Sequence, residues 1–84
     1  MAIVEVYSTA LCPYCVMAKK LLERKGVDFN EIRVDKDPAK REEMMSKSQQ
    51  RTVPQIFIHG QSIGGFTDLA ELDRTGQLDT LLAK

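Results

Sequence analysis

The feature that most constrains this chain is a pair of cysteines separated by two residues and placed between a short apolar run and a helical pattern. The apolar run covers residues 3–7, and Cys12 and Cys15 follow it closely. The residues after Cys15 have the spacing of an amphipathic helix. A strand that leads into Cys-x-x-Cys and then into a helix is the sequence context of a redox-active thiol pair. We therefore ask what the rest of the chain contributes to these two sulfur atoms.

Apolar periodicity and turn residues predict the order β-α-β-α-β-β-α, with a short helix appended. Pro13 and Pro38 stand at first helical positions, and Gly26 and Gly76 end helices. The strand–helix–strand start implies two parallel strands joined by a right-handed crossover. The expected elements are strands over residues 2–8, 29–34, 54–58 and 61–64, helices over residues 13–25 and 38–48, a helix that Thr67 or Asp68 caps, and a final helix around residues 78–82.

This pattern predicts an α/β fold, with a four-stranded mixed sheet flanked by helices on both faces. The length of 84 residues suits a single domain over residues 1–84. The first helix is expected to bury one stripe, and the second helix is expected to lie on the surface because its apolar face is weak. The expected stripe comprises Val16, Ala18, Leu21 and Leu22.

Charge and hydropathy exclude several classes of partner. Lys and Arg total 12 and Asp and Glu total 12, so the chain has no long-range field to attract nucleic acid or an anionic membrane. No apolar run approaches the roughly 20 residues of a membrane span, and the N-terminus lacks a signal-peptide pattern. We expect a monomer in the cytoplasm, where a cysteine pair is more often catalytic or metal-binding than structural.

Thiol–disulfide exchange needs a thiolate nucleophile. A fall of about 3 units in a thiol pKa corresponds to about 4 kcal/mol, whereas a helix dipole contributes only about 0.3–2 kcal/mol. Hydrogen bonds from the free amides of Tyr14 and Cys15, or from the Cys15 thiol, must supply much of the remaining stabilisation of the Cys12 thiolate. Cys12 at the helix start should be exposed and should attack, and Cys15, partly covered, should resolve the mixed disulfide.

The alternative interpretation of the pair is a zinc half-site or two inert thiols. A structural zinc site needs four ligands, and this chain offers two cysteines and a single histidine, which falls in a turn. We therefore expect no metal.

Four stretches resemble the glutaredoxin family, and in particular its small bacterial dithiol members of the glutaredoxin 3 type. They are Cys12-Pro13-Tyr14-Cys15, Thr52-Val53-Pro54-Gln55-Ile56-Phe57-Ile58, Ile63-Gly64-Gly65 and Asp68-Leu69. The resemblance spans essentially the whole chain. It implies a thioredoxin fold with strand order 2-1-3-4 and a glutathione-dependent thiol–disulfide oxidoreductase, which reduces protein disulfides and glutathione mixed disulfides through a redox disulfide between Cys12 and Cys15.

The resemblance also implies a glutathione groove beside Cys12. One wall would contain a cis peptide bond before Pro54, with the Val53 backbone paired to the cysteinyl unit of glutathione. The other wall would offer helix N-terminal amides to the γ-glutamyl carboxylate and the Asp68 carboxylate to the amino group; Thr67 and Asp68 can also simply cap the helix. The implied glutathione-binding residues are Tyr14, Arg51, Thr52, Val53, Pro54, Gly65, Phe66, Thr67 and Asp68.

Two positions depart from the family pattern. Thr9 stands where many relatives have lysine, and Val16 stands where many have a basic or polar residue. Arg51 or Arg41 is a candidate replacement for the missing cation, and each is otherwise a solvated surface charge. We expect a weaker affinity for glutathione or a less acidic Cys12 than in relatives with the lysine.

Two other functions share these motifs. Some relatives hold a [2Fe–2S] cluster between two chains and two glutathiones, but Pro13-Tyr14-Cys15 disfavours that function here. The other is electron donation to a specific protein, such as ribonucleotide reductase, which the sequence does not separate from general deglutathionylation.

Overall fold

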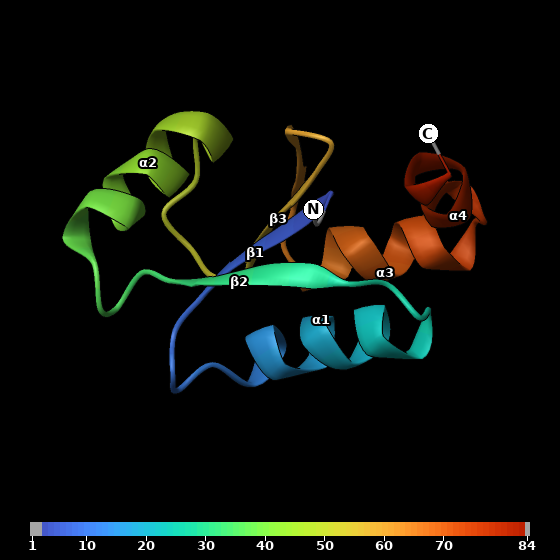
Figure 1. Cartoon of the computed structure of the whole chain (residues 1–84), viewed down its shortest axis with the longest axis horizontal. Helices are drawn as coiled ribbons and strands as arrows, with labels where there is room; N and C mark the ends of the chain where they lie inside the picture. Colours follow the sequence, from blue (N-terminus) through green and yellow to red (C-terminus); the bar gives the residue numbers. More distant parts are fainter. Residues whose placement is uncertain (1–2, 84) are drawn as a thin grey trace.

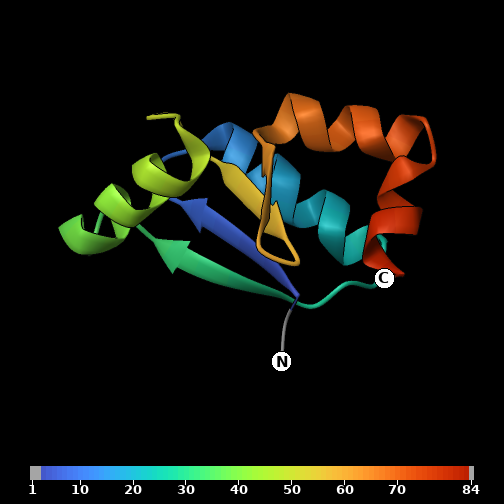
Figure 2. The same ribbon diagram turned by 90° about the horizontal axis from the view of Figure 1, so that it is seen from above.

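Four strands form one mixed sheet in the order β2-β1-β3-β4 in the computed structural model, which describes residues 3–83. Strand β1 pairs in parallel with β2 and antiparallel with β3, and β3 pairs antiparallel with β4. Figure 2 shows β2, β1 and β3 side by side. The elements are β1 Val4–Ser8, α1 Pro13–Arg24, β2 Phe29–Arg33, α2 Pro38–Ser48, β3 Gln55–Ile58, β4 Gln61–Gly64, α3 Phe66–Arg74 and α4 Gln77–Leu82.

This arrangement confirms the predicted element order and the predicted sheet order. The expected start of the first strand at Ala2 lies outside the described residues. Two helices begin where the sequence predicts. Helix α1 starts at Pro13, and at the start of α2 the Asp37 carboxylate accepts the Ala39 amide at 3.1 Å. No helix of the described chain is long and apolar enough to cross a membrane.

The start of α3 differs from the prediction. The N-cap is Gly65, so Thr67 and Asp68 lie inside the first turn. The Asp68 carboxylate instead reaches back and accepts the Gly65 amide at 3.0 Å. A side chain three residues into a helix can satisfy the amide of the cap residue in this way, and a glycine at the cap leaves that task to Asp68.

The helices cover both faces of the sheet, and α1 and α2 lie on opposite sides of it (Figure 1). One cluster of buried residues joins the sheet to α1, α3 and α4, and a second joins it to α2. In the first cluster Ala18, Leu21 and Leu22 are buried as predicted. The prediction for Val16 is wrong: its side chain is 42% exposed, because Cys15 takes the inward position at the start of α1.

Helix α2 lies on the surface as predicted, and Met44 is its one buried residue. Met44 is fully buried in the second cluster with Tyr7 and Phe57, whose rings meet edge to face at 5.4 Å. A single methionine fills the gap that a weakly apolar helix would otherwise leave, which suits its flexible side chain.

Candidate active site

Cys12 and Cys15 are joined by a disulfide at the start of α1. Cys12 is the N-cap of the helix, and its Sγ accepts the Cys15 amide at 3.1 Å. A helix leaves its first amides without partners inside the helix, so the sulfur occupies a position where an N–H donor is already directed at it. This donor favours negative charge on Cys12 when the disulfide is reduced.

The two sulfur atoms differ in access. Cys15 is fully buried, whereas Cys12 retains 9% exposure. Cys12 is therefore the more accessible of the two, as predicted, but it is less open than the sequence indicates. The reason is geometric: its sulfur is bonded to Cys15 and lies 3.8 Å from the Val53 carbonyl oxygen.

The loop before β3 forms one wall beside Cys12. The peptide bond between Val53 and Pro54 is cis, as expected from the resemblance. The buried Gln55 carboxamide fastens this loop, since its Nε2 donates to the Thr52 carbonyl oxygen at 3.0 Å and lies 3.2 Å from the Thr52 Oγ1. The Gln55 Oε1 has no hydrogen-bond partner among the described residues.

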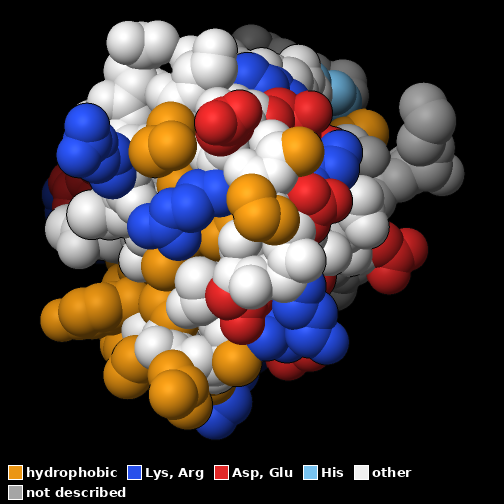
Figure 3. Space-filling view, turned by 90° about the vertical axis from the view of Figure 1, so that its left-hand side faces the viewer, with side chains coloured by type: hydrophobic (Ala, Val, Ile, Leu, Met, Phe, Trp, Pro, Cys, Tyr) orange, Lys and Arg blue, Asp and Glu red, His pale blue; other side chains and the backbone are white. Residues whose placement is uncertain are grey.

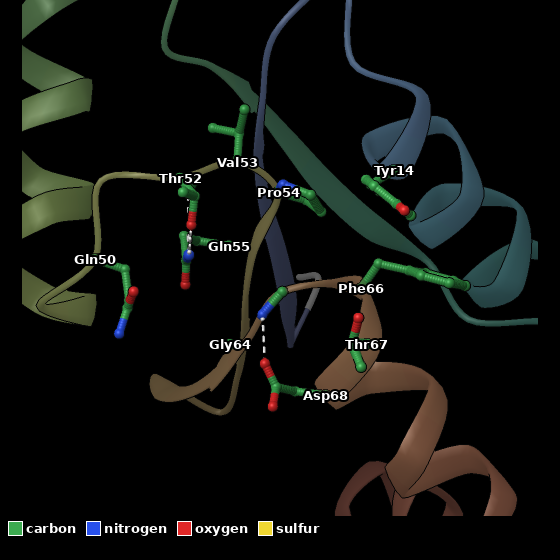
Figure 4. Close-up of a pocket in the computed structure, with 11 residues that line it drawn as sticks. Tyr14, Gln50, Thr52, Val53, Pro54, Gln55, Gly64, Phe66, Thr67 and Asp68 are labelled. Atoms are coloured by element: carbon green, nitrogen blue, oxygen red, sulfur yellow. Dashed lines mark hydrogen bonds between the residues drawn. The ribbon is translucent and has the colours of Figure 1, made fainter.

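The start of α3 forms the opposite wall. Gly64 and Gly65 bring the chain from β4 into the helix, and Gly64 has a φ of +113°, in the region that glycine tolerates. Figure 4 shows Phe66, Thr67 and Asp68 across the groove from Thr52, Val53 and Pro54. The ring of Phe66 stacks on that of Tyr14, with 6.1 Å between centroids.

Between these walls is a pocket of about 280 Å³. It brings together eight of the nine residues that the resemblance implies for glutathione; Arg51 does not line it and lies exposed on the preceding loop. Three further lining residues were not singled out from the sequence. The lining residues are Tyr14, Gln50, Thr52, Val53, Pro54, Gln55, Gly64, Gly65, Phe66, Thr67 and Asp68.

A signal for two of those three residues was present in the sequence. Gln55 and Gly64 both belong to the stretches that carry the family resemblance, where the apolar pattern predicts strands. Gln50 lies in the loop after α2, and no motif marks it.

An ion pair at the end of β2 supports the loop that carries Cys12. Arg33 binds the Asp35 carboxylate through two hydrogen bonds of 2.8 and 2.6 Å. The Asp35 carboxylate also accepts the Ala10 amide at 3.3 Å, two residues before Cys12. The Arg33 guanidinium and, to a lesser extent, the Ala10 amide hold the pKa of Asp35 well below its usual range. The loop is therefore tied to an ionised carboxylate at neutral pH.

A second network of hydrogen bonds connects β1, β2 and α1. The Glu31 carboxylate accepts the Lys19 ammonium and the Ser8 hydroxyl, each at 2.7 Å. These two donors, Lys19 first, lower the pKa of Glu31. The contacts fix the end of β1 and the middle of α1, the two elements that flank the cysteine loop.

Within residues 3–83, no three side chains of His, Cys, Asp or Glu gather in a way that could hold a metal ion. The site that the structure shows is a disulfide at the start of α1 beside a groove.

Comparisons with known proteins point in the same direction. The family model described as Glutaredoxin matches residues 4–63. Glutaredoxin 3 of Escherichia coli strain K12 is 56% identical over 82 residues, which cover 98% of this chain and 99% of that protein. A glutaredoxin of Pseudomonas aeruginosa is 52% identical over 80 residues, 95% of each chain. The crystal structure of a buckwheat glutaredoxin–glutathione complex has a TM-score of 0.89 at 33% identity, covering 96% of this chain and 76% of that one.

Proposed function

Because the chain belongs to the glutaredoxin family and is a thiol–disulfide oxidoreductase, we propose that it uses glutathione as its reductant and binds it in the pocket beside Cys12. The observation that supports this most directly is the position of the pocket. Its wall includes Val53, whose carbonyl oxygen lies 3.8 Å from the Cys12 sulfur. A ligand lying along this wall would present its own sulfur to Cys12.

In the proposed reaction the Cys12 thiolate attacks the glutathionyl sulfur of a mixed disulfide. The substrate S–S bond breaks, and the substrate sulfur leaves as a thiolate that takes up a proton. The mixed disulfide on Cys12 is then resolved by a second glutathione, which yields glutathione disulfide. With a protein disulfide as substrate, Cys15 loses its proton and attacks Cys12 instead, so the pair is oxidised as the substrate gains two electrons.

The walls of the pocket suit the three parts of glutathione. The backbone of Val53 can pair with the cysteinyl unit. The first residues of α3 line the groove, so their free amides can donate to the γ-glutamyl carboxylate. Asp68 can attract the γ-glutamyl ammonium while one of its oxygens holds the Gly65 amide. Tyr14, Phe66 and Thr67 complete the walls, and we propose Arg51 as the cation nearest to the glycine carboxylate.

The wider setting follows from the same chemistry. A dithiol that glutathione regenerates works in a reducing compartment, so we propose the cytoplasm. We propose that residues 1–84 act as one domain and as a monomer, with disulfide-containing or glutathionylated proteins as substrates and ribonucleotide reductase as one candidate.

The conservative variant Asp68→Asn tests the groove. Asparagine can still accept the Gly65 amide and is itself a good capping residue, but it removes the negative charge that would attract the γ-glutamyl ammonium. The reduced protein is mixed with one peptide carrying either glutathione or cysteine in a mixed disulfide, and the single-turnover rate constants are compared. We expect a loss of about 3- to 10-fold with the glutathionyl peptide and less than 2-fold with the cysteinyl peptide.

Asp37→Asn is the control, since the Asp37 carboxylate also accepts a backbone amide at the start of a helix and does not line the pocket. It should leave both rate constants unchanged. Equal losses of Asp68→Asn on both peptides, or no loss on either, would show that Asp68 does not recognise the γ-glutamyl group and that the groove is assigned wrongly.

A further inference from the structure

Among the residues that line the pocket, Gln55 alone combines a polar side chain with burial. It is the first residue of β3 and is only 2% exposed. Its Nε2 donates to the Thr52 carbonyl oxygen at 3.0 Å, whereas its Oε1 has no hydrogen-bond partner among the described residues. A buried acceptor without a donor lowers stability, and an apolar side chain of similar size would avoid that loss. Stability therefore does not account for a glutamine at this position.

The hydrogen bonds of Thr52 all involve Gln55. Thr52 is an exposed residue, and within residues 3–83 its backbone and its hydroxyl have no other hydrogen-bond partner. The start of the same loop is held differently, since the hydroxyl of Ser48 at the end of α2 bonds both backbone groups of Gln50. The loop is thus anchored to α2 at its start and to the first residue of β3 at Thr52.

The Thr52 carbonyl belongs to the same peptide unit as the Val53 N–H. Within residues 3–83 the cis bond is the next one along the chain, between Val53 and Pro54, so the Thr52–Val53 unit is trans. A peptide unit is planar, and in its trans form the C=O and the N–H point in opposite directions. The hydrogen bond from Gln55 that fixes the carbonyl therefore also fixes the direction of the N–H. It also polarises the unit, which makes the N–H a better donor.

The Val53 N–H is a donor on the wall of the groove that no other described residue uses. Val53 lines the pocket, and its N–H makes no hydrogen bond within residues 3–83. Its carbonyl oxygen lies 3.8 Å from the Cys12 sulfur. A ligand whose sulfur reacts with Cys12 therefore brings its own backbone close to this peptide unit. A donor that is already directed binds a ligand carbonyl without first having to order the loop.

We propose that Gln55 is a positioning residue of the groove. By holding the Thr52–Val53 peptide unit, it directs the Val53 N–H to the carbonyl of the cysteinyl unit whose sulfur meets Cys12. It acts through this peptide unit and not on the sulfur atoms. This role rests on the groove proposed above and adds the side chain that orients its backbone donor. The consequence is a preference for sulfur carried on a peptide backbone over sulfur carried on a simple alkyl chain.

The test measures single-turnover rate constants of the reduced protein with three disulfides of 2-mercaptoethanol. Its partner in the disulfide is glutathione, N-acetylcysteine amide or a second 2-mercaptoethanol, and only the first two have a cysteinyl carbonyl. Acidic and basic side chains both stand on the face shown in Figure 3, so the neutral amide separates the effect of the backbone from that of charge. Gln55→Met keeps the length of the side chain and removes the donor. It should slow the first two substrates by about 3- to 10-fold and the third by less than about 2-fold.

Gln49→Met is the matched control. The Gln49 carboxamide also donates to the backbone carbonyl three residues earlier, that of Ser46 at 2.7 Å, but Gln49 does not line the pocket. This variant should leave all three rate constants within about 2-fold of wild type.

Urea unfolding of the oxidised proteins separates a positioning role from a structural one. The midpoint for Gln55→Met should stay within about 0.5 M of wild type, because the variant loses a buried acceptor without a partner together with the donor. Gln55→Leu also lacks the donor, and it should give the same pattern of rate constants if Gln55→Met folds poorly.

Three results with the Gln55 variants would overturn the proposal. They are equal slowing on all three substrates, no slowing on any of them, and slowing with the glutathione disulfide alone, which would place the effect at the γ-glutamyl or glycyl part. A wild type that reacts equally fast with all three substrates would refute the groove itself, and the role of Gln55 with it. A wild-type preference for the two cysteinyl substrates that both Gln55 variants retain would refute the role of Gln55 alone.

Discussion

Replacement of Tyr7 by phenylalanine isolates one partly buried hydrogen bond between the sheet and α2. The Tyr7 hydroxyl donates to the Glu43 Oε2 at 2.7 Å, and Lys47 donates to the same hydroxyl at 3.3 Å. A hydrogen bond to a charged group contributes about 1.5–3 kcal/mol. The Glu43 side chain is 40% exposed, so water can replace the lost donor, and we expect a loss of only about 1–1.5 kcal/mol in the free energy of unfolding.

Urea unfolding of the oxidised protein measures this loss. Phenylalanine keeps the ring that packs edge to face on Phe57, so a cavity does not contribute. With a slope of about 1 kcal/mol per molar urea for a small domain, the midpoint should fall by about 1 M.

The pH dependence of the free energy of unfolding provides a second test of the Tyr7–Glu43 hydrogen bond. The Tyr7 hydroxyl, ahead of other causes, lowers the pKa of Glu43 from its ordinary value of 4.5. A lowered carboxyl pKa contributes stability that is present above the unfolded-state pKa and is lost as the pH falls through the folded-state pKa. The difference between wild type and Tyr7→Phe should therefore be full at pH 7 and shrink below about pH 4.

A double-mutant cycle with Glu43→Gln completes the test, and the two substitutions should be less than additive at pH 7. Wild-type stability for Tyr7→Phe, or an equal loss at pH 7 and pH 3, would refute the reasoning.

Two further substitutions examine the surroundings of the sulfur. Thr9→Lys supplies the cation that many relatives have. It should lower the pKa of Cys12 by about half a unit to one unit or strengthen the binding of glutathione. Thiolate absorbance and the glutathione KM measure these effects, and no change in either would show that the missing lysine does not weaken the site. Gly64→Ala places a Cβ against the Asp68 carboxylate at a φ of +113°, so it should cost about 1–3 kcal/mol in stability and slow the reaction with glutathionyl peptides. Gly60→Ala has a φ of +78° with open space around the new Cβ, and it should cost stability alone; a reaction slowed as much as by Gly64→Ala would contradict the role of Asp68.

Much of the fold could be predicted because local signals agree with the tertiary structure. Pro13 and Pro38 mark two helix starts, and the turn at His59 and Gly60 sets the β3–β4 hairpin, where both residues have positive φ. The predictions failed where a local rule had two solutions. Either Thr67 or a glycine can begin α3, and the choice depends on how Gly64 and Gly65 leave β4.

At the candidate active site, local sequence rules likewise leave several features unpredicted. Helical spacing predicts Val16 on the inward face, but Cys15, Ala18 and Leu22 occupy it at positions i, i+3 and i+7. The hydrogen bonds from the Gln55 Nε2 to Thr52 depend on the path of the loop before β3, which no single-residue preference determines. The exposure of Leu11 likewise follows from the loop geometry.

The central claim is that Cys12 carries the chemistry with glutathione as its reductant. The most direct test is glutathione-dependent reduction of a small mixed disulfide by wild type, Cys12→Ser and Cys15→Ser. We expect Cys12→Ser to be inactive and Cys15→Ser to retain activity, because glutathione can release Cys12 without the second thiol. A wild type that is inactive with glutathione but accepts electrons from a thioredoxin reductase would contradict it, as would a Cys12→Ser variant that keeps its activity.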